Sequence, residues 1–136
     1  MIREIIHDLD FLSQKSTPAT TDDKQIMTDL LDTLRAHLDN CVGMAANMIG
    51  ENKRIIVFCK GNKQVVMANP VIIRKSGQFI TEETCLSVPG SKATARYNEI
   101  EVVFQDENFV RRQTKFSGWT AQIIQHEIDH CNGILI

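Results

Sequence analysis

Hydrophobic residues recur along the chain with two different spacings, and these spacings predict where helices and strands form. Between residues 22 and 39 apolar side chains recur every three or four positions, as in an amphipathic helix, with Thr21 as a candidate N-cap. A second helix is predicted at 119–131, where Gly133 can end it. Residues 13–22 are polar and are expected to form an extended loop. Short runs rich in β-branched residues predict strands at 54–59, 64–68, 71–74, 79–83, 99–105 and 109–115.

This order of elements predicts an α+β fold. We expect mostly antiparallel β-sheets packed around a C-terminal helix, together with one N-terminal helix. The chain contains no internal repeat, low-complexity tract or linker, so residues 1–136 are expected to form a single domain. The sequence therefore indicates an ordinary globular protein rather than a fibrous or disordered one.

Charge and hydropathy narrow the possible partners. The chain has 15 Lys and Arg residues against 17 Asp and Glu residues, and this balance removes the simple electrostatic case for nucleic-acid binding. No apolar run is long enough to cross a bilayer, and acidic residues interrupt the first ten positions, where a signal peptide needs an apolar core. We therefore expect a cytoplasmic protein with no membrane and no nucleic-acid partner.

The predicted C-terminal helix carries the segment Gln125-His-Glu-Ile-Asp-His130. His126 and His130 lie four residues apart, so one face of a helix presents both imidazoles to one point. Glu127 lies beside the first histidine, near enough to act on a water at a metal without binding the metal. This is the His-Glu-x-x-His arrangement of metal-dependent hydrolases. The alternative is a helix with two ordinary histidines and a solvated glutamate; the register on a predicted helix favours the metal site.

The third metal ligand must come from elsewhere in the chain. Cys131 is a poor candidate because it is the immediate neighbour of His130. Cys85 is the natural candidate, since it lies in a polar strand-to-loop segment, whereas Cys41 and Cys59 are flanked by apolar residues and remain rivals. Two histidines and one cysteine leave a fourth position open, which is the catalytic pattern. With no secretion signal, the thiols are expected to be reduced rather than paired in disulfides.

Three segments in order along the chain resemble the signatures of the peptide deformylase family. The family signatures are Gly-x-Gly-x-Ala-Ala-x-Gln, Glu-Gly-Cys-Leu-Ser and Gln-His-Glu-x-Asp-His. The corresponding segments here are Cys41-Val-Gly-Met-Ala-Ala-Asn-Met48, Glu83-Thr-Cys-Leu-Ser87 and Gln125-His-Glu-Ile-Asp-His130. The likeness spans about residues 40–134, and only the third signature is intact.

The resemblance implies a reaction and a cofactor. The reaction would be hydrolysis of the N-formyl group from the N-terminal methionine of newly made polypeptides, with transient contact to the ribosome. Cys85, His126 and His130 would hold one divalent metal, with Fe²⁺ the first expectation and Zn²⁺ or Ni²⁺ as alternatives.

The resemblance also implies roles for residues around the metal. Glu127 would be the general acid and base, and the backbone N–H of Leu86 would stabilise the oxyanion. Val42, Gly43 and Thr84 would bind the substrate, with Gly43 on an edge strand to which the peptide adds by main-chain hydrogen bonds. An apolar pocket between Val42 and the last helix would hold the methionine side chain.

The chain departs from the family at three signature positions. Cys41 and Thr84 replace glycines, and Met48 replaces the glutamine whose amide stabilises the oxyanion. Losing one such donor costs roughly 3–4 kcal/mol in other enzymes. Asn47 could supply a donor only through a one-residue shift of the loop. The alternative function is therefore a weakened homologue that binds metal or formyl-peptide without efficient turnover; the intact Glu127 favours the enzyme.

Two further expectations and one rival function stay open. The resemblance suggests that Glu83 and Arg96 pair behind the metal cysteine, although two unrelated surface charges fit the spacing equally well. Trp119 either lines the substrate cleft or, more commonly for such spacing, packs in the core. A small metalloprotease is the remaining rival, and the absence of a ligand downstream of His130 argues against it.

Overall fold

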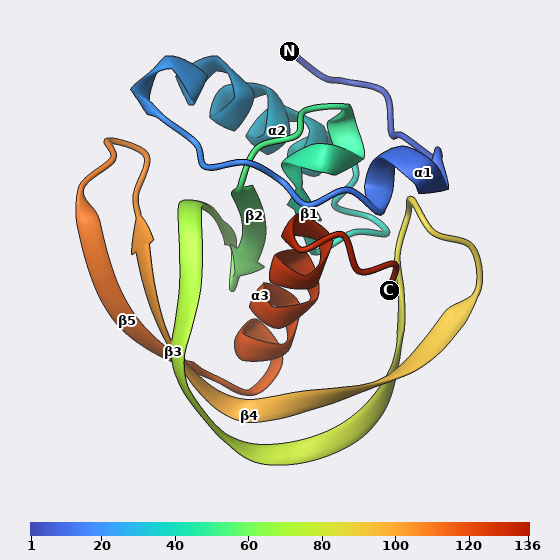
Figure 1. The fold of residues 1–136 in the computed structure, drawn as a ribbon, viewed down its shortest axis with the longest axis vertical. Helices are drawn as coiled ribbons and strands as arrows, with labels where there is room; N and C mark the ends of the chain where they lie inside the picture. The colour runs from blue at the N-terminus through green and yellow to red at the C-terminus, as the bar shows by residue number, and fades with distance from the viewer.

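A computed structural model describes residues 1–136, and it has the predicted α+β fold (Figure 1). Five strands form one antiparallel sheet in the order β1-β2-β3-β4-β5. The strands are β1 (Gly43–Ala45), β2 (Ile55–Lys60), β3 (Lys63–Thr84), β4 (Ser91–Gln105) and β5 (Arg111–Ser117). The helices are α1 (Leu9–Leu12), α2 (Lys24–Ala36) and α3 (Gly118–Cys131), with short 3₁₀ turns η1 (Thr21–Asp23) and η2 (Ala46–Ile49).

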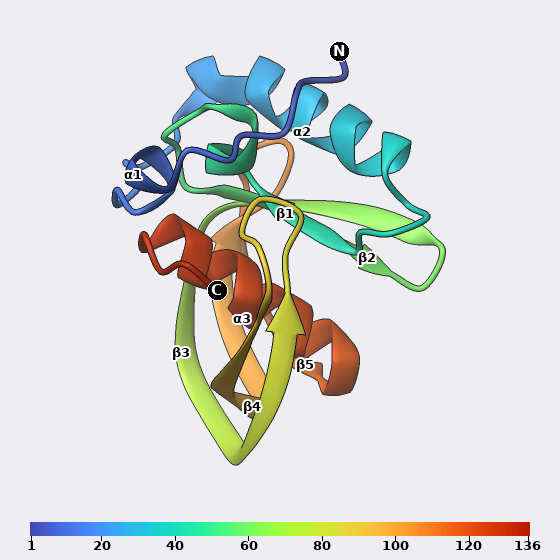
Figure 2. The same ribbon diagram turned by 90° about the vertical axis from the view of Figure 1, so that its right-hand side faces the viewer.

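Strand β2 separates the two main helices, and its alternating side chains explain why. Ile55 and Val57 point to one face of the sheet and join the apolar residues of α2, while Ile56 and Phe58 point to the other face and join those of α3. Figure 2 shows the same layering, with β1 and β2 passing between α2 and α3. A strand that is buried on both faces therefore anchors both helices, which fixes the position of α3 in the fold.

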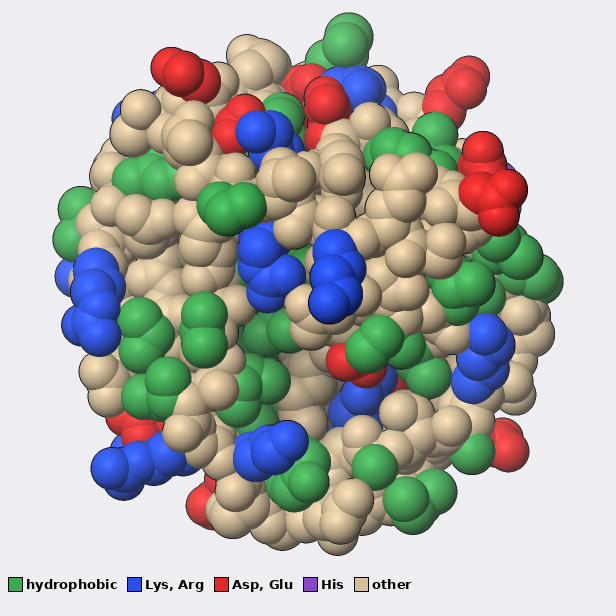
Figure 3. Space-filling view, viewed as in Figure 1, with side chains coloured by type: hydrophobic (Ala, Val, Ile, Leu, Met, Phe, Trp, Pro, Cys, Tyr) green, Lys and Arg blue, Asp and Glu red, His purple; other side chains and the backbone are tan.

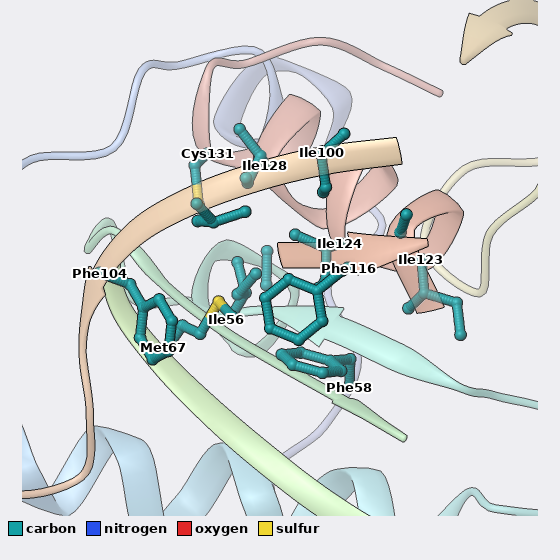
Figure 4. Close-up of a cluster of buried hydrophobic side chains, with 13 residues drawn as sticks. Ile56, Phe58, Met67, Ile100, Phe104, Phe116, Ile123, Ile124, Ile128 and Cys131 are labelled. Carbon is teal, nitrogen blue, oxygen red and sulfur yellow. The ribbon is translucent and has the colours of Figure 1, made fainter. Parts of the chain in front are cut away.

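The apolar side of α3 lies in a closely packed core. Ile124 of this helix lies beside Phe116 and Phe58, whose rings meet edge to face with centroids 6.0 Å apart, and Ile128 belongs to the same buried cluster (Figure 4). Burying one Ile or Phe side chain contributes about 1.5–3 kcal/mol. Because α3 carries the His-Glu-x-x-His segment, this core also holds the candidate metal ligands in place.

Strands β3 and β4 form a long curved hairpin around α3 (Figure 1). The sequence predicts three separate strands within β3, and this prediction is wrong, because the Asn69-Pro70 pair bends the strand without ending it. Asn69 adopts a left-handed conformation with φ of 52°, and its side chain exchanges two hydrogen bonds with the backbone of Ala19. The register shifts between Ala68 and Val71 at this point. A bulge of this kind curves the strand and turns its far half toward α3.

Helix boundaries differ from the predicted ones by a few residues. Thr20, not Thr21, begins the N-terminal helical segment, because its side chain forms a capping box with Asp23. The short helix α1 is not predicted by the apolar spacing; Asp8 caps it by accepting two backbone N–H groups. Gly133 follows α3 with φ of 75°, as predicted for a residue that ends a helix.

The helices are too short and too polar for a bilayer span. On the face shown in Figure 3, Lys and Arg side chains lie scattered among hydrophobic ones.

Candidate metal centre and its cleft

Helix α3 brings His126 and His130 together one turn apart. Their Nε2 atoms are 3.2 Å from each other, and both side chains are buried, with His130 fully inaccessible. The four-residue spacing therefore produces the convergence that the sequence predicts.

Cys85 completes a cluster of three donor atoms. Strand β3 ends at Thr84, and the next residue places its Sγ 3.4 Å from Nε2 of His130. The ligand atoms of Cys85, His126 and His130 all lie within 4.8 Å of one another. The backbone N–H of Ser87 points to the same sulfur at 3.5 Å. The three rival thiols are outside this cluster: Cys41, Cys59 and Cys131.

These separations fit a small metal ion. A tetrahedral ion with nitrogen ligands at ~2.05 Å and a sulfur ligand at ~2.3 Å would place its nitrogens about 3.3 Å apart and each nitrogen about 3.6 Å from the sulfur. The measured distances of 3.2 Å and 3.4 Å are close to these values. Burial lowers the pKa of His130 to about 3, so its ring is neutral and keeps a lone pair for a metal. The donor set therefore suits a divalent cation with one coordination position left open.

Glu83 and Arg96 form a buried pair behind the cluster, as the resemblance suggests. Arg96 donates to both carboxylate oxygens of Glu83 at 2.9 and 2.7 Å, and to Asp129 at 2.7 Å. Nδ1 of His126 lies 2.7 Å from the same carboxylate, and the amide of Gln122 donates to it at 2.9 Å. This carboxylate can therefore fix the orientation of the His126 ring.

The pKa of Glu83 reflects these contacts. Burial disfavours the charged carboxylate, but the hydrogen bonds from His126, Arg96 and Gln122 outweigh it and lower the pKa to about 2. Its contribution to stability is therefore complete above about pH 4.5 and is lost as the pH falls toward 2. The sequence indicated Asp129 only as a position of the third signature and did not indicate Gln122, although both lie within one turn of a histidine on α3.

Glu127 lies beside the cluster in a buried position. Its Oε1 atom has no hydrogen-bond partner, and burial raises the pKa of the carboxyl group to about 7. Gly43 of β1 packs directly against it: a Cβ at this position would lie 2.9 Å from Oε2 of Glu127 and 2.7 Å from Ile123. A larger residue at position 43 would therefore displace the side chains of Ile123 and Glu127, and glycine lets β1 approach α3 without moving them.

A cleft of about 570 Å³ opens from this centre to solvent. Its inner end is formed by buried residues, including Glu127 and Met48, and its mouth by exposed ones, including Val42 and Trp119. Trp119 is 61% exposed, so the expectation of a core tryptophan is wrong. The remaining substrate-site candidates also line the cleft: Gly43, Thr84 and Leu86.

The loop that carries Met48 keeps the register of the family signature. Met48 lines the cleft and has no hydrogen-bond donor to offer. The amide nitrogen of Asn47 is used elsewhere, because it donates to the backbone carbonyl of His130 at 3.0 Å. Cys41 donates to the carbonyl of Gly43 at 3.0 Å, and burial raises the pKa of its thiol to about 12. Met48 lines the cleft, and Asn47 does not. The one-residue shift that would let Asn47 replace the missing donor is therefore absent.

Comparison with known proteins agrees with this geometry. Residues 2–136 match the family described as "Polypeptide deformylase". A peptide deformylase of Clostridium beijerinckii is 54% identical over 136 residues, which is the full length of both chains. A peptide deformylase of Dictyoglomus thermophilum is 37% identical over 115 residues, covering 83% of this chain and 73% of the relative. Because these relatives are named as enzymes, they favour the enzyme over the weakened homologue.

Solved structures show the same fold. A peptide deformylase from Legionella pneumophila superimposes with a TM-score of 0.88 at 34% identity, covering 99% of this chain and 83% of that one. A Met-Ala-Ser-bound class I type b peptide deformylase from Acinetobacter baumannii gives a TM-score of 0.89 at 28% identity, with 99% and 96% coverage.

Proposed function

Since this chain belongs to the peptide deformylase family and is a metal-dependent hydrolase of N-formyl-methionyl polypeptides, we propose that Cys85, His126 and His130 hold its metal ion. The observation that carries this proposal is the convergence of their donor atoms within 4.8 Å beside a buried glutamate. Residues 1–136 would act together as a single catalytic domain.

We propose Fe²⁺ as the metal, with Zn²⁺ or Ni²⁺ as substitutes. One cysteine sulfur and two imidazole nitrogens are suitable ligands for all three ions. When bound, a divalent ion acts as a Lewis acid and makes water acidic enough to ionise near neutral pH.

Glu127 would move the proton in the reaction. Its unpaired Oε1 and its pKa of about 7 allow it to accept a proton from the attacking water and to return it to the departing amine. The pKa of an ordinary glutamate lies about three units lower, which makes it a weaker base at neutral pH.

The substrate would lie along β1, which is an edge strand of the sheet. Val42, Gly43 and Thr84 would bind the peptide backbone by main-chain hydrogen bonds, and the methionine side chain would enter the cleft between Val42 and α3. The N–H of Leu86 would stabilise the oxyanion. A deformylase from Acinetobacter baumannii with Met-Ala-Ser bound supports a peptide as the ligand class.

New polypeptides are the proposed partners. Acting on them would place the enzyme in the cytoplasm, with transient contact to the ribosome and no nucleic-acid or membrane binding of its own.

The direct test is formate release by anaerobically purified protein whose metal content is measured. Formyl-Met-Ala-Ser should yield formate and Met-Ala-Ser, whereas acetyl-Met-Ala-Ser should remain intact. The proposed function fails if a chain loaded with Fe²⁺ leaves the formyl-peptide unchanged. Activity that persists through long exposure to air would point to Zn²⁺ instead, because both Fe²⁺ and its thiolate ligand oxidise.

A further inference from the structure

Two side chains on the wall of the cleft have hydrogen-bonding groups that the protein itself does not use. Thr81 of β3 lines the cleft, and its hydroxyl group has no partner within the protein. Gln122 of α3 also lines the cleft, and its amide nitrogen donates one hydrogen bond to Glu83 at 2.9 Å. An amide nitrogen carries two hydrogens, so the second N–H of Gln122 is left for a ligand.

Both side chains face the cavity in which the methionine side chain is proposed to lie. Glu83 points toward α3, because its carboxylate contacts His126 and Gln122. Side chains two residues apart on a strand point to the same face, so Thr81 also points toward α3, about 7 Å along the strand from Glu83. Gln122 lies one turn before His126 on the helix. Thr81 and Gln122 therefore place two free donors on the wall of this cavity.

A methionine side chain cannot satisfy these donors. Its thioether sulfur is a weak acceptor, and the side chain displaces the water that would otherwise pair with them. Methionine sulfoxide has nearly the same shape but carries a polar S=O group whose oxygen accepts hydrogen bonds. A purely apolar pocket rejects a substrate with one added polar group by about a hundred-fold. Donors on the wall should reduce that rejection.

We infer that the cavity also accepts methionine sulfoxide, so that the enzyme deformylates polypeptides whose first methionine is oxidised. This inference rests on the proposed function, because it places the first side chain of the substrate in the cleft. Thr81 and Gln122 would each donate to the sulfoxide oxygen. One such hydrogen bond changes an equilibrium by about two- to ten-fold, so the two together should bring the sulfoxide substrate within about ten-fold of the methionine substrate in kcat/KM.

The test compares two substrates that differ only by the sulfoxide oxygen. The metal-loaded enzyme is assayed with formyl-Met-Ala-Ser and with each epimer of its sulfoxide separately, because the sulfoxide sulfur is chiral. The variants are Thr81→Val and Gln122→Leu, each of which removes a donor with little change of shape. Thr94→Val and Gln113→Leu are matched controls outside the cleft: Thr94 is the cross-strand partner of Thr81, and Gln113 donates to Glu101 on the exposed side of β5.

The readout is the ratio of kcat/KM for the better sulfoxide epimer to that for the methionine peptide. Because Gln122→Leu also removes a hydrogen bond from Glu83, absolute activity would mix two effects, whereas an effect on the metal centre acts on both substrates and cancels in the ratio. Calorimetry with Met-Ala-Ser and its sulfoxide gives the same comparison as a ratio of Kd values, without turnover.

We expect a ratio of at least about one tenth in the wild type, a fall of about two- to ten-fold in Thr81→Val and in Gln122→Leu, and no change in the two controls. Rejection of both epimers by more than about ten-fold in the wild type overturns the inference, as does a ratio that neither variant lowers more than its control does. Failure of the proposed function is distinct from both results, because formyl-Met-Ala-Ser itself would then remain intact.

Discussion

At the scale of single residues, the chemistry depends on side chains whose surroundings change their ordinary properties. Burial keeps the ring of His130 neutral and raises the pKa of Glu127 to about 7. Gly43 lets β1 approach α3 so closely that Glu127 lies against the backbone of β1. The identities of these residues can be read from the sequence, but their burial depends on contacts between segments far apart in the chain.

The role of Glu127 can be tested with an isosteric change. Glu127→Gln should retain the metal and lose about 10²- to 10⁴-fold in kcat, because an amide cannot accept the proton at neutral pH. Steady-state kinetics and metal analysis on the same sample check this, with Glu107→Gln as a charge-matched control. Normal turnover by Glu127→Gln would rule out the assigned role.

Because Met48 offers no hydrogen-bond donor, we expect that a substitution which adds a donor at this position increases activity. Met48→Gln should place an amide donor at the inner end of the cleft and raise kcat by about ten-fold or more, with a smaller change in KM, because the new bond strengthens in the transition state. Asn47→Ala should instead lower the free energy of unfolding by about 1 kcal/mol, since Asn47 hydrogen-bonds to His130.

Parallel kinetics on Met48→Gln and the wild type decide whether this loop takes part in catalysis. If kcat does not rise in a correctly folded, metal-loaded Met48→Gln protein, side-chain stabilisation of the oxyanion from this loop is not part of the mechanism.

At the scale of elements, α3 and the end of β3 together build the centre. The period of the apolar residues and the Gly133 stop predict α3 almost to the residue, because a helix is a local structure. Strand β3 is predicted only in pieces, because the Asn69-Pro70 bulge is stabilised by a non-local contact with Ala19. The pair of Glu83 and Arg96 joins adjacent strands, so spacing alone could not establish it.

Removing Arg96 should destabilise the fold. Arg96→Leu leaves the carboxylates of Glu83 and Asp129 without their cation, and a broken buried pair costs about 3–5 kcal/mol. Arg111→Leu, an exposed arginine on β5 without an ion pair, should change stability by less than about 0.5 kcal/mol. Equal unfolding free energies for the two variants in denaturant titrations would contradict this role.

At the scale of the whole molecule, one sheet with a helix on each face places the candidate metal centre between β1, β3 and α3. The α+β class and the residues that converge at the candidate centre can be predicted from the sequence and its family resemblance. The exposed position of Trp119 and the hydrogen bond from Asn47 to His130 cannot be predicted in this way, because both depend on how α3 packs against the sheet.

Metal binding should stabilise the fold, because the ligands come from segments that only the folded chain brings together. At a metal concentration ~1,000 times the Kd this contributes about 4 kcal/mol. Anaerobic treatment with a chelator should therefore lower Tm, and adding Fe²⁺ or Zn²⁺ should restore it. A Tm that does not respond to either step would show that the metal and the fold are not coupled.

The most direct test of the metal centre is the metal content of cysteine variants purified without oxygen. Wild type and Cys59→Ala should each carry one equivalent of metal, because Cys59 lies outside the donor cluster. Cys85→Ala should lose tight binding and retain little metal after desalting. A full equivalent of metal in Cys85→Ala would contradict the assignment of Cys85, His126 and His130 as the metal ligands.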